Sequence, residues 1–275
     1  MNILLIFPPS TIYGKDPTIP SVVLPLGLAY IAAYLERECY KVSILDARSL
    51  SKDRVIASSG KALYGLTDDE LRLAVEKNSP DIVGISCMYT AYSADAHRVA
   101  KIVKGVNRDI PVIMGGAYAS AFPDVVMKDA NVDAVAHAEG EETFLALVKR
   151  VENKKDFSGV AGATFRDMSG RVIANPARDF IKDLDSIPFP ARHLLDMSLY
   201  LEKQAGPYAM RAPSSTIITS RGCPNACAYC TIKFVCGSRR WRGRSAVNVV
   251  NEMELLYKRY GVREFQIIDD SAGTS

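Results

Sequence analysis

Short apolar runs alternate with amphipathic segments over the first 150 residues, and this alternation restricts the fold more than any other feature. Runs at residues 2–7, 41–47, 81–88, 111–116 and 132–140 have the length and composition of buried β-strands. The segments between them predict helices at about 25–38, 68–78, 94–104 and 141–151, with Thr67 as an N-cap. Strands this apolar are buried on both faces, so we expect an α/β domain with a doubly wound parallel sheet. Its ligand should lie beyond the carboxyl ends of the strands.

The overall composition is that of a globular protein with enough apolar material for a sizeable core. A length of 275 residues favours two domains at roughly 100 to 200 residues each. A net charge of +3 gives no reason to expect a nucleic-acid or acidic membrane partner. The start of the chain lacks the basic region and cleavage site of a secretory signal. The longest apolar stretch, residues 22–35, is shorter than the roughly 20 residues of a membrane span. We therefore expect a cytoplasmic protein without a membrane span.

The pattern changes after Asn153. Residues 162–175 predict a β-hairpin with its turn at 167–170, and Pro188 and Pro190 interrupt the linker at 183–196. A strand at 215–220, a helix at 246–260 capped by Ser245, and a strand at 264–270 follow. These boundaries predict a first domain at 1–152, a hairpin and linker at 153–212, and the start of a second domain at 213–275.

The most specific chemical feature is a set of cysteines directly after the strand at 215–220: Cys223, Cys227 and Cys230. A structural zinc site would need four ligands, usually as two pairs, and the other cysteines supply no second pair. A thioredoxin-like redox pair would leave Cys223 unexplained, and a loop with glycine and proline does not suit buried apolar cysteines. Three thiolates fit an iron–sulfur cluster in which one iron stays open to a substrate or cosubstrate.

These cysteines, with Tyr229 before the last of them, resemble the motif of the radical S-adenosylmethionine superfamily. The resemblance implies a [4Fe-4S] cluster on Cys223, Cys227 and Cys230, with S-adenosylmethionine on the open iron and a 5′-deoxyadenosyl radical as the product of its cleavage. It also implies that residues 213–275 are the amino-terminal part of a partial (β/α) TIM barrel.

Tyr229 and Asp269 would contact the cofactor, and Asp270 would point toward the site. The alternative for the two acids is that they cap the next helix. The run at 239–245 resembles the segment after the cluster loop, and its alternative is a nucleic-acid patch.

The first domain lacks the GxGxxG of a dinucleotide-binding domain, but glycines follow its later strands. The stretches "PLGLAYIAAYLE", "GIS", "GGAYAS" and "EGEETF" resemble the Rossmann-like cobalamin-binding domain that precedes many radical S-adenosylmethionine domains. This resemblance implies a corrinoid across the carboxyl edge of the sheet. The implied contacts are Gly84, Ser86, Gly115, Gly116, Ser120, Glu139, Gly140 and Glu141. No DxHxxG motif is present, and the only histidines of this domain are His97 and His137, so the lower ligand of cobalt stays open.

Together these features resemble the cobalamin-dependent radical S-adenosylmethionine group of methyltransferases and anaerobic magnesium-protoporphyrin monomethyl ester cyclases. That resemblance implies methyl transfer to, or oxidative cyclisation of, an unactivated carbon in a lipid, tetrapyrrole or natural product. It also implies a reductant such as flavodoxin or ferredoxin, and no nucleic-acid partner. Two alternatives stay open. One is a truncated corrinoid- and cluster-binding module without turnover, since the chain continues only to Ser275. The other is a radical S-adenosylmethionine enzyme that modifies nucleic acid.

Overall fold

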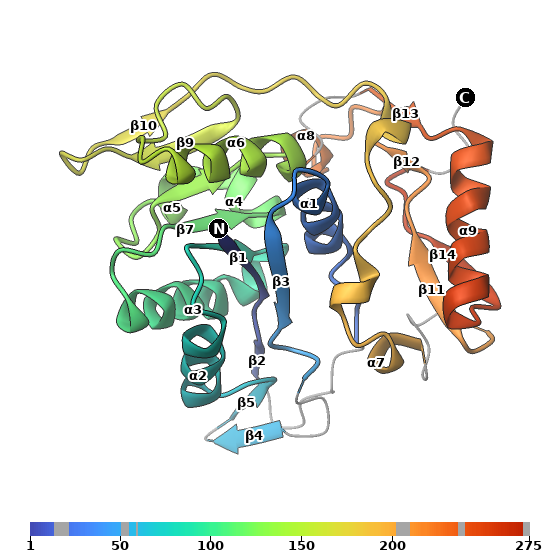
Figure 1. Ribbon diagram of the computed structural model, residues 1–275, viewed down its shortest axis with the longest axis horizontal. Coiled ribbons are helices and arrows are strands. Elements are labelled where there is room, and N and C mark those ends of the chain that lie inside the picture. Colours follow the sequence, from blue (N-terminus) through green and yellow to red (C-terminus); the bar gives the residue numbers. More distant parts are fainter. Residues whose placement is uncertain (14–21, 51–54, 59, 202–209, 236–239, 272–275) are drawn as a thin grey trace.

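The computed structural model describes the chain except for residues 14–21, 51–54, 59, 202–209, 236–239 and 272–275. Its main feature is a 7-stranded sheet with the order β10-β9-β8-β7-β6-β1-β3 (Figure 1). The parallel strands are β1 (Asn2–Phe7), β3 (Lys41–Asp46), β6 (Ile82–Ser86), β7 (Val112–Gly115) and β8 (Ala134–Ala136). The strand order reverses between β1 and β6, which is the topological switch point of a doubly wound sheet. The predicted fold class is confirmed.

Helices cover both faces of this sheet, as the apolar strands predict. Helices α1 (Leu26–Arg37) and α6 (Gly140–Glu152) pack on one face. Helices α2 (Asp68–Asn78) and α3 (Ser93–Val106) pack on the other, with the short α4 (Ala117–Ala121) and α5 (Pro123–Val126). Because side chains alternate along a strand, Ile3 and Leu5 of β1 enter the first core while Leu4 and Ile6 enter the second.

The predicted helix starts are built by side-chain caps. Thr67 accepts a hydrogen bond from the Glu70 backbone N–H, and Glu70 accepts one from the Thr67 N–H, which forms a capping box. Ser245 caps α9 (Ala246–Tyr260) by accepting from the Asn248 N–H at 3.1 Å. Gly261 ends α9 in the left-handed conformation. These local signals explain why the predicted boundaries of α2 and α9 agree with the structure.

A small 3-stranded sheet beside the main one is absent from the sequence prediction. It consists of β2 (Ser10–Tyr13), β5 (Lys61–Tyr64) and β4 (Val55–Ser58), all antiparallel. The 3-10 helix η1 (Thr90–Tyr92) lies after β6 and precedes α3. Strands of four residues carry too little alternation to be distinguished from loop.

The predicted hairpin exists as β9 (Ala163–Arg166) and β10 (Val172–Ala174), but it belongs to the main sheet. Strand β9 pairs antiparallel with β8, with Phe165 opposite Ala134. The hairpin is therefore an extension of the first domain. The linker begins after it and contains η2 (Leu184–Ser186), η3 (Arg192–Leu194) and α7 (Ser198–Leu201).

The second unit is a β-α-β arrangement on the far side of the linker (Figure 1). Strand β11 (Ser214–Ile217) pairs parallel with β14 (Glu264–Ile267), and α9 packs on them through Leu256, beside Val262 of the loop that follows the helix. The predicted strand at 215–220 is divided, because β12 (Ser220–Arg221) turns away to pair with β13 (Arg242–Gly243). The short helix α8 (Ile232–Val235) lies between β12 and β13 in the chain. Within the described ranges, no helix is both long enough and apolar enough to cross a bilayer.

Candidate functional site

The cysteine loop leaves the carboxyl end of β12 and ends at α8. Cys223 and Cys230 are half-buried and Cys227 is exposed, and all three are free thiols. The Cys230 N–H donates to the Cys227 carbonyl at 3.2 Å, and the Asn225 amide donates to the Cys223 sulfur at 3.6 Å. The Tyr229 side chain is 89% exposed. The loop thus presents three sulfurs and an aromatic side chain at the surface.

The cysteine loop contacts the first domain at the edge of the main sheet where the parallel strands have their carboxyl ends. Helix α8, directly after the cysteines, packs against α4. Helix α4 itself starts at the carboxyl end of β7, after Gly115 and Gly116. The sheet edge that should hold a ligand and the three cysteines are therefore on the same side of the molecule.

Two acids at the end of β14 hold the start of the cysteine loop. The Asp269 carboxylate accepts from the Thr219 N–H at 2.7 Å and from the hydroxyls of Thr219 and Ser220 at 2.5 and 2.6 Å. The Asp270 carboxylate accepts from the Gly222 N–H at 3.1 Å. Gly222 has a φ of +87° and lies so close to the Arg240 carbonyl that any Cβ would collide with it. Asp269, which was predicted to contact the cofactor, thus holds the backbone at the start of the loop.

Two glutamates predicted to contact the corrinoid form ion pairs with the second unit. Arg221 of β12 binds Glu141 at 2.5 Å and approaches Glu139 at 3.6 Å. Arg242 of β13 binds Glu139 at 2.5 Å and donates to the Ile181 carbonyl at 2.6 Å. Burial raises the pKa of the Glu141 carboxyl, but the charge and hydrogen bond of Arg221, a backbone hydrogen bond and the charge of Arg242 together leave the pKa below its usual value. Both carboxylates are committed to arginines, so their side chains join the two units.

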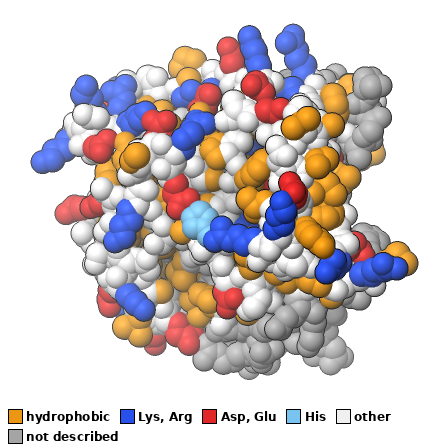
Figure 2. Space-filling model, turned by 45° about the vertical axis from the view of Figure 1, so that its right-hand side comes forward, with side chains coloured by type: hydrophobic (Ala, Val, Ile, Leu, Met, Phe, Trp, Pro, Cys, Tyr) orange, Lys and Arg blue, Asp and Glu red, His pale blue; other side chains and the backbone are white. Residues whose placement is uncertain are grey.

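A second buried network holds the linker. Arg192 of η3 binds Glu252 of α9 at 2.7 Å and donates to the Thr216 carbonyl at 3.0 Å. Arg244 also binds Glu252 and donates to the Ile218 carbonyl at 2.7 Å. Arg242 and Arg244 belong to the basic run at 239–245, and both are buried in these contacts. On the face shown in Figure 2, basic and acidic side chains are mixed. These observations weigh against the nucleic-acid alternative.

The glycines that were predicted to contact the corrinoid have different structural roles in the first domain. A Cβ at Gly84 would come within 2.8 Å of Leu5 and Phe144, so the close packing of α6 on β6 requires this glycine. A Cβ at Gly140 would likewise come 2.9 Å from Ile31 of α1. Gly116 has a φ of +101° at the carboxyl edge, and a Cβ there would lie 2.6 Å from the Cys87 carbonyl. A Cβ at Gly115 would make only ordinary van der Waals contact, with Ala136 at 3.6 Å or more.

The remaining predicted contacts lie around the same edge. The Ser120 hydroxyl accepts from the Ala138 N–H at 2.9 Å, and this ties α4 to the loop after β8. Ser86 ends β6 and lines a hollow at the switch point. His137 binds the Thr164 hydroxyl at 2.8 Å, and burial lowers the pKa of its imidazole. His97 binds Asp129 at 2.7 Å. Both histidines of the first domain thus have partners within the protein.

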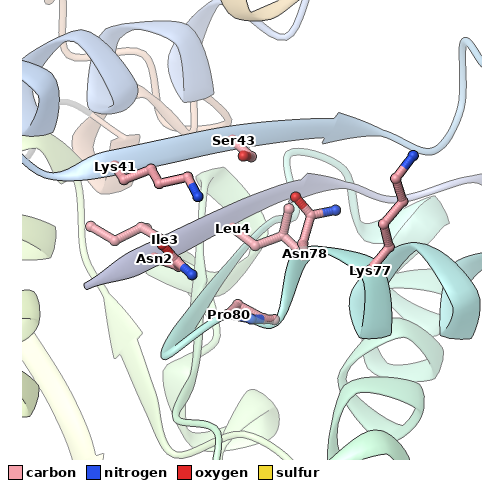
Figure 3. Close-up of a pocket in the computed structure, with 8 residues that line it drawn as sticks. All are labelled: Asn2, Ile3, Leu4, Lys41, Ser43, Lys77, Asn78 and Pro80. Atoms are coloured by element: carbon pink, nitrogen blue, oxygen red, sulfur yellow. The ribbon is translucent and has the colours of Figure 1, made fainter.

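A further hollow lies at the opposite edge of the sheet (Figure 3). It is lined by the amino ends of β1 and β3, including Asn2 and Lys41, and by the end of α2 with Lys77 and Asn78. Doubly wound sheets bind ligands at their carboxyl ends, so this hollow is on the wrong side for the predicted cofactors.

Comparisons with known proteins agree with this arrangement. The profile of the B12 binding domain family matches residues 17–148. The chain is 35% identical over 98% of its length to an uncharacterized methyltransferase of Pyrococcus horikoshii, of which it covers 54%. It is 34% identical over 98% of its length to cytidylyl-2-hydroxyethylphosphonate methyltransferase of Streptomyces wedmorensis, of which it covers 55%. It is 31% identical over 90% of its length to anaerobic magnesium-protoporphyrin IX monomethyl ester cyclase of Rubrivivax gelatinosus, of which it covers 41%.

Solved structures share the fold. The radical S-adenosylmethionine methyltransferase TsrM from Kitasatospora setae, with cobalamin and a [4Fe-4S] cluster bound, superposes with a TM-score of 0.69 at 18% identity. The cobalamin-dependent S-adenosylmethionine radical enzyme OxsB, with aqua-cobalamin bound, superposes with a TM-score of 0.72 at 19% identity. Each covers 98% of this chain, and the chain spans 48% of the TsrM chain and 34% of the OxsB chain. Residues 17–148 thus match the B12 binding domain family, and the chain shares its fold with two cobalamin-dependent S-adenosylmethionine radical enzymes. The chain spans about half the length of the curated relatives named above.

The cysteine loop fits an iron–sulfur cluster in its donor chemistry. Three thiols are the ligand type of iron–sulfur clusters, and three are fewer than a closed site would use. In the described part of the chain, no three His, Cys, Asp or Glu side chains are already gathered as a metal-ligand set. Cluster binding by Cys223, Cys227 and Cys230 therefore requires the loop between Gly222 and α8 to close around the cluster.

Proposed function

We propose that this chain holds a [4Fe-4S] cluster on Cys223, Cys227 and Cys230 and a corrinoid across the carboxyl ends of β1, β6, β7 and β8. The observation that carries the proposal is the attachment of the cysteine loop to that sheet edge, through α8 on α4 and through Arg221 on Glu141. The bound cofactors would supply reductive cleavage of S-adenosylmethionine to a 5′-deoxyadenosyl radical, and methyl transfer to or cyclisation at an unactivated carbon.

The residues of the chain position these groups. Asp269 and Asp270 fix the strand end before Cys223, and Gly222 allows the sharp turn into the loop. The open edge at Gly115 leaves backbone room for a large planar ligand. Tyr229, which is exposed beside Cys230, would contact S-adenosylmethionine. The ion pairs of Glu139 and Glu141 hold the two units at a fixed distance, as two cofactors that share one substrate require.

We infer a small-molecule substrate, since the relatives are named for a nucleotidyl phosphonate and a tetrapyrrole. A flavodoxin or ferredoxin would supply the electron for cleavage, and a reducing compartment such as the cytoplasm suits the free cysteines.

Anaerobic reconstitution of the chain with iron, sulfide and hydroxocobalamin tests the proposal. We expect about four iron atoms per chain and the optical and EPR signals of a [4Fe-4S] cluster. A variant with Cys223, Cys227 and Cys230 replaced by alanine should lose these signals, whereas Cys39→Ala, at an exposed cysteine of the first domain, should keep them. An undiminished cluster in the triple variant would exclude the assignment.

Addition of S-adenosylmethionine and dithionite separates an enzyme from a binding module. Formation of 5′-deoxyadenosine supports radical cleavage by this chain. Cluster and corrinoid uptake without 5′-deoxyadenosine would instead identify a binding module.

A further inference from the structure

A hollow at the topological switch point contains a charged side chain that the proposed chemistry does not use. It lies between the loops that follow β1 and β6, at the edge where doubly wound sheets bind ligands. Its walls are mostly apolar and aromatic, and Arg48, two residues after β3, lies among them. The lining residues are Phe7, Pro8, Pro9, Ser10, Arg48, Ser86, Cys87, Met88, Tyr89 and Tyr92.

Arg48 is buried without an acceptor for its charge. It is 6% exposed, and its Nε has no hydrogen-bond partner. Among the described residues, no acceptor takes a hydrogen bond from its guanidinium and no carboxylate lies within ion-pair distance. Its neighbours are the rings of Tyr92, Phe7 and Tyr64, at 5.6, 6.0 and 6.0 Å from the guanidinium carbon. Ring faces attract a cation but do not replace the oxygens that its N–H groups need.

Other arginines with little exposure show what Arg48 lacks. Arg192, Arg221 and Arg242 each bind a glutamate, at 2.7, 2.5 and 2.5 Å. A buried charge is normally paired, because its removal from water is costly. Among the described residues, Arg192 and Arg48 are the two most buried arginines, and Arg192 has a carboxylate partner while Arg48 has none.

The carboxylates of Asp46 and Asp95, two buried acids of the first domain, bind other groups. The Asp46 carboxylate accepts from the backbone N–H groups of Arg48 and Ser49 and from the Tyr200 hydroxyl. Burial raises the pKa of the Asp46 carboxyl, which favours its neutral form. The Asp95 carboxylate accepts from the backbone and hydroxyl of Thr11 at 2.7 Å each. Neither acid compensates the charge of Arg48.

We propose that Arg48 binds an oxyanion, a phosphate or carboxylate group of a ligand that enters the hollow between the β1 and β6 loops. The planar fork of a guanidinium matches the paired oxygens of both groups. The surrounding rings of Phe7 and Tyr92 contact the adjoining apolar part of the ligand. Two sources share this chemistry: the nucleotide phosphate of a corrinoid and an acidic group of the substrate. The choice of source rests on the proposed function, but the oxyanion site rests on Arg48 and its surroundings alone.

Inorganic phosphate is the first probe, with thermal unfolding and calorimetric titration at constant ionic strength. Phosphate should raise the Tm of the wild-type chain, and Arg48→Met should abolish this rise. Without phosphate, Arg48→Met should unfold at the same or a higher temperature, because it removes an unpaired buried charge. That result would separate loss of a ligand site from loss of the fold.

Arg72→Gln, at an exposed arginine paired with Asp69, should respond to phosphate as wild type does. A wild-type chain without a phosphate response, or an Arg48→Met variant that retains it, would overturn the site.

Hydroxocobalamin and cobinamide, which lacks the nucleotide and its phosphate, distinguish the two sources. If the nucleotide phosphate is the occupant, Arg48→Met should weaken cobalamin binding at least tenfold and leave cobinamide binding unchanged. If both corrinoids bind the variant as they bind wild type while the phosphate response is lost, the occupant is an acidic substrate. A wild-type chain that responds to phosphate but takes up neither corrinoid would contradict the proposed function and leave the oxyanion site standing.

Discussion

Asp269 holds the cysteine loop in place through the strand end that precedes it. Its carboxylate accepts three hydrogen bonds, from the Thr219 N–H and from the hydroxyls of Thr219 and Ser220. An ionised carboxylate accepts hydrogen bonds through both oxygens, whereas an amide directs one of its two polar atoms as a donor. The replacement of one oxygen by an NH2 group must therefore break part of this arrangement.

We expect Asp269→Asn to lower the free energy of unfolding by about 1 to 2 kcal/mol, the range of one or two lost charge-assisted hydrogen bonds. Reconstituted iron content should also fall, and the remaining cluster should decay faster in air, because the loop is less firmly held. Asp69→Asn, at an exposed acid on α2, is the control and should change neither quantity. Unchanged stability with lost cluster would indicate that Asp269 contacts the cofactors directly.

The cysteines could be found from sequence because their spacing is a property of one short segment. The partners of Glu139, Glu141 and Arg242 could not be found this way. Glu139 and Arg242 are 103 residues apart in the chain, and only the folded arrangement shows that they meet. Similarly, a basic run at 239–245 has the composition of a surface patch, although Arg242 and Arg244 are buried in ion pairs. Arg48 carried no sequence signal, because what distinguishes it is the absence of a partner.

At the scale of elements, the strands of the main sheet and the long helices were predictable, whereas the small sheet of β2, β4 and β5 and the short helices were not. Strands β1, β3 and β6 are apolar runs of five or six residues, and α2 and α9 begin at clear N-caps. Helices α4 and α8, of five and four residues, are too short to show a helical period. These two short helices bring the cysteine loop to the sheet edge, so the sequence predicted both parts of the site but not their contact.

Gly116 connects β7 to α4, and its conformation decides whether α4 can start there. Its φ of +101° is strained for any residue with a Cβ, and that Cβ would lie 2.6 Å from the Cys87 carbonyl. We expect Gly116→Ala to lower the free energy of unfolding by about 2 to 4 kcal/mol, from strain and the forced shift of backbone. Corrinoid affinity should fall with it, since this turn lies at the proposed binding edge.

Gly105 provides the matched control for this substitution. It lies inside α3, and a Cβ there meets nothing within 4 Å. Because alanine is the better helix former, Gly105→Ala should raise the free energy of unfolding by about 0.5 to 1 kcal/mol. Chemical denaturation of both variants measures these values. Equal effects at the two positions would contradict the role given to Gly116.

At the scale of the whole molecule, buried ion pairs fix the second unit against the first. Arg221 and Arg242 reach across to Glu141 and Glu139, while Arg192 of the linker joins Glu252 of α9. Such pairs contribute little net stability relative to an apolar contact, but the removal of one partner is costly. The geometry they impose, with the cysteine loop over the sheet edge, is the arrangement that two cofactors acting on one substrate need.

Glu141→Gln tests this arrangement through its pH dependence. The folded chain holds the pKa of Glu141 below its ordinary value of 4.5, because the charge and hydrogen bond of Arg221, with smaller effects of a backbone hydrogen bond and Arg242, together outweigh burial. A carboxyl with a lowered folded pKa stabilises the protein above the unfolded pKa and loses that contribution as pH falls through the folded value. At pH 7 we therefore expect Glu141→Gln to cost about 3 kcal/mol, the lower end for a broken buried pair, since Arg221 keeps its contact with Glu139.

The difference between wild type and Glu141→Gln should stay constant down to about pH 5 and shrink below the unfolded glutamate pKa near 4.3. Urea denaturation at a series of pH values measures it. Glu254→Gln, which removes the exposed pair with Lys258, should cost less than about 1 kcal/mol at every pH.

If the ion pairs couple the unfolding of the two units, the wild-type chain should unfold in one calorimetric transition. The combination of Glu139→Gln with Glu141→Gln should then separate this transition into two. A single transition in the double variant would show that the linker contacts of Arg192 alone couple the two units.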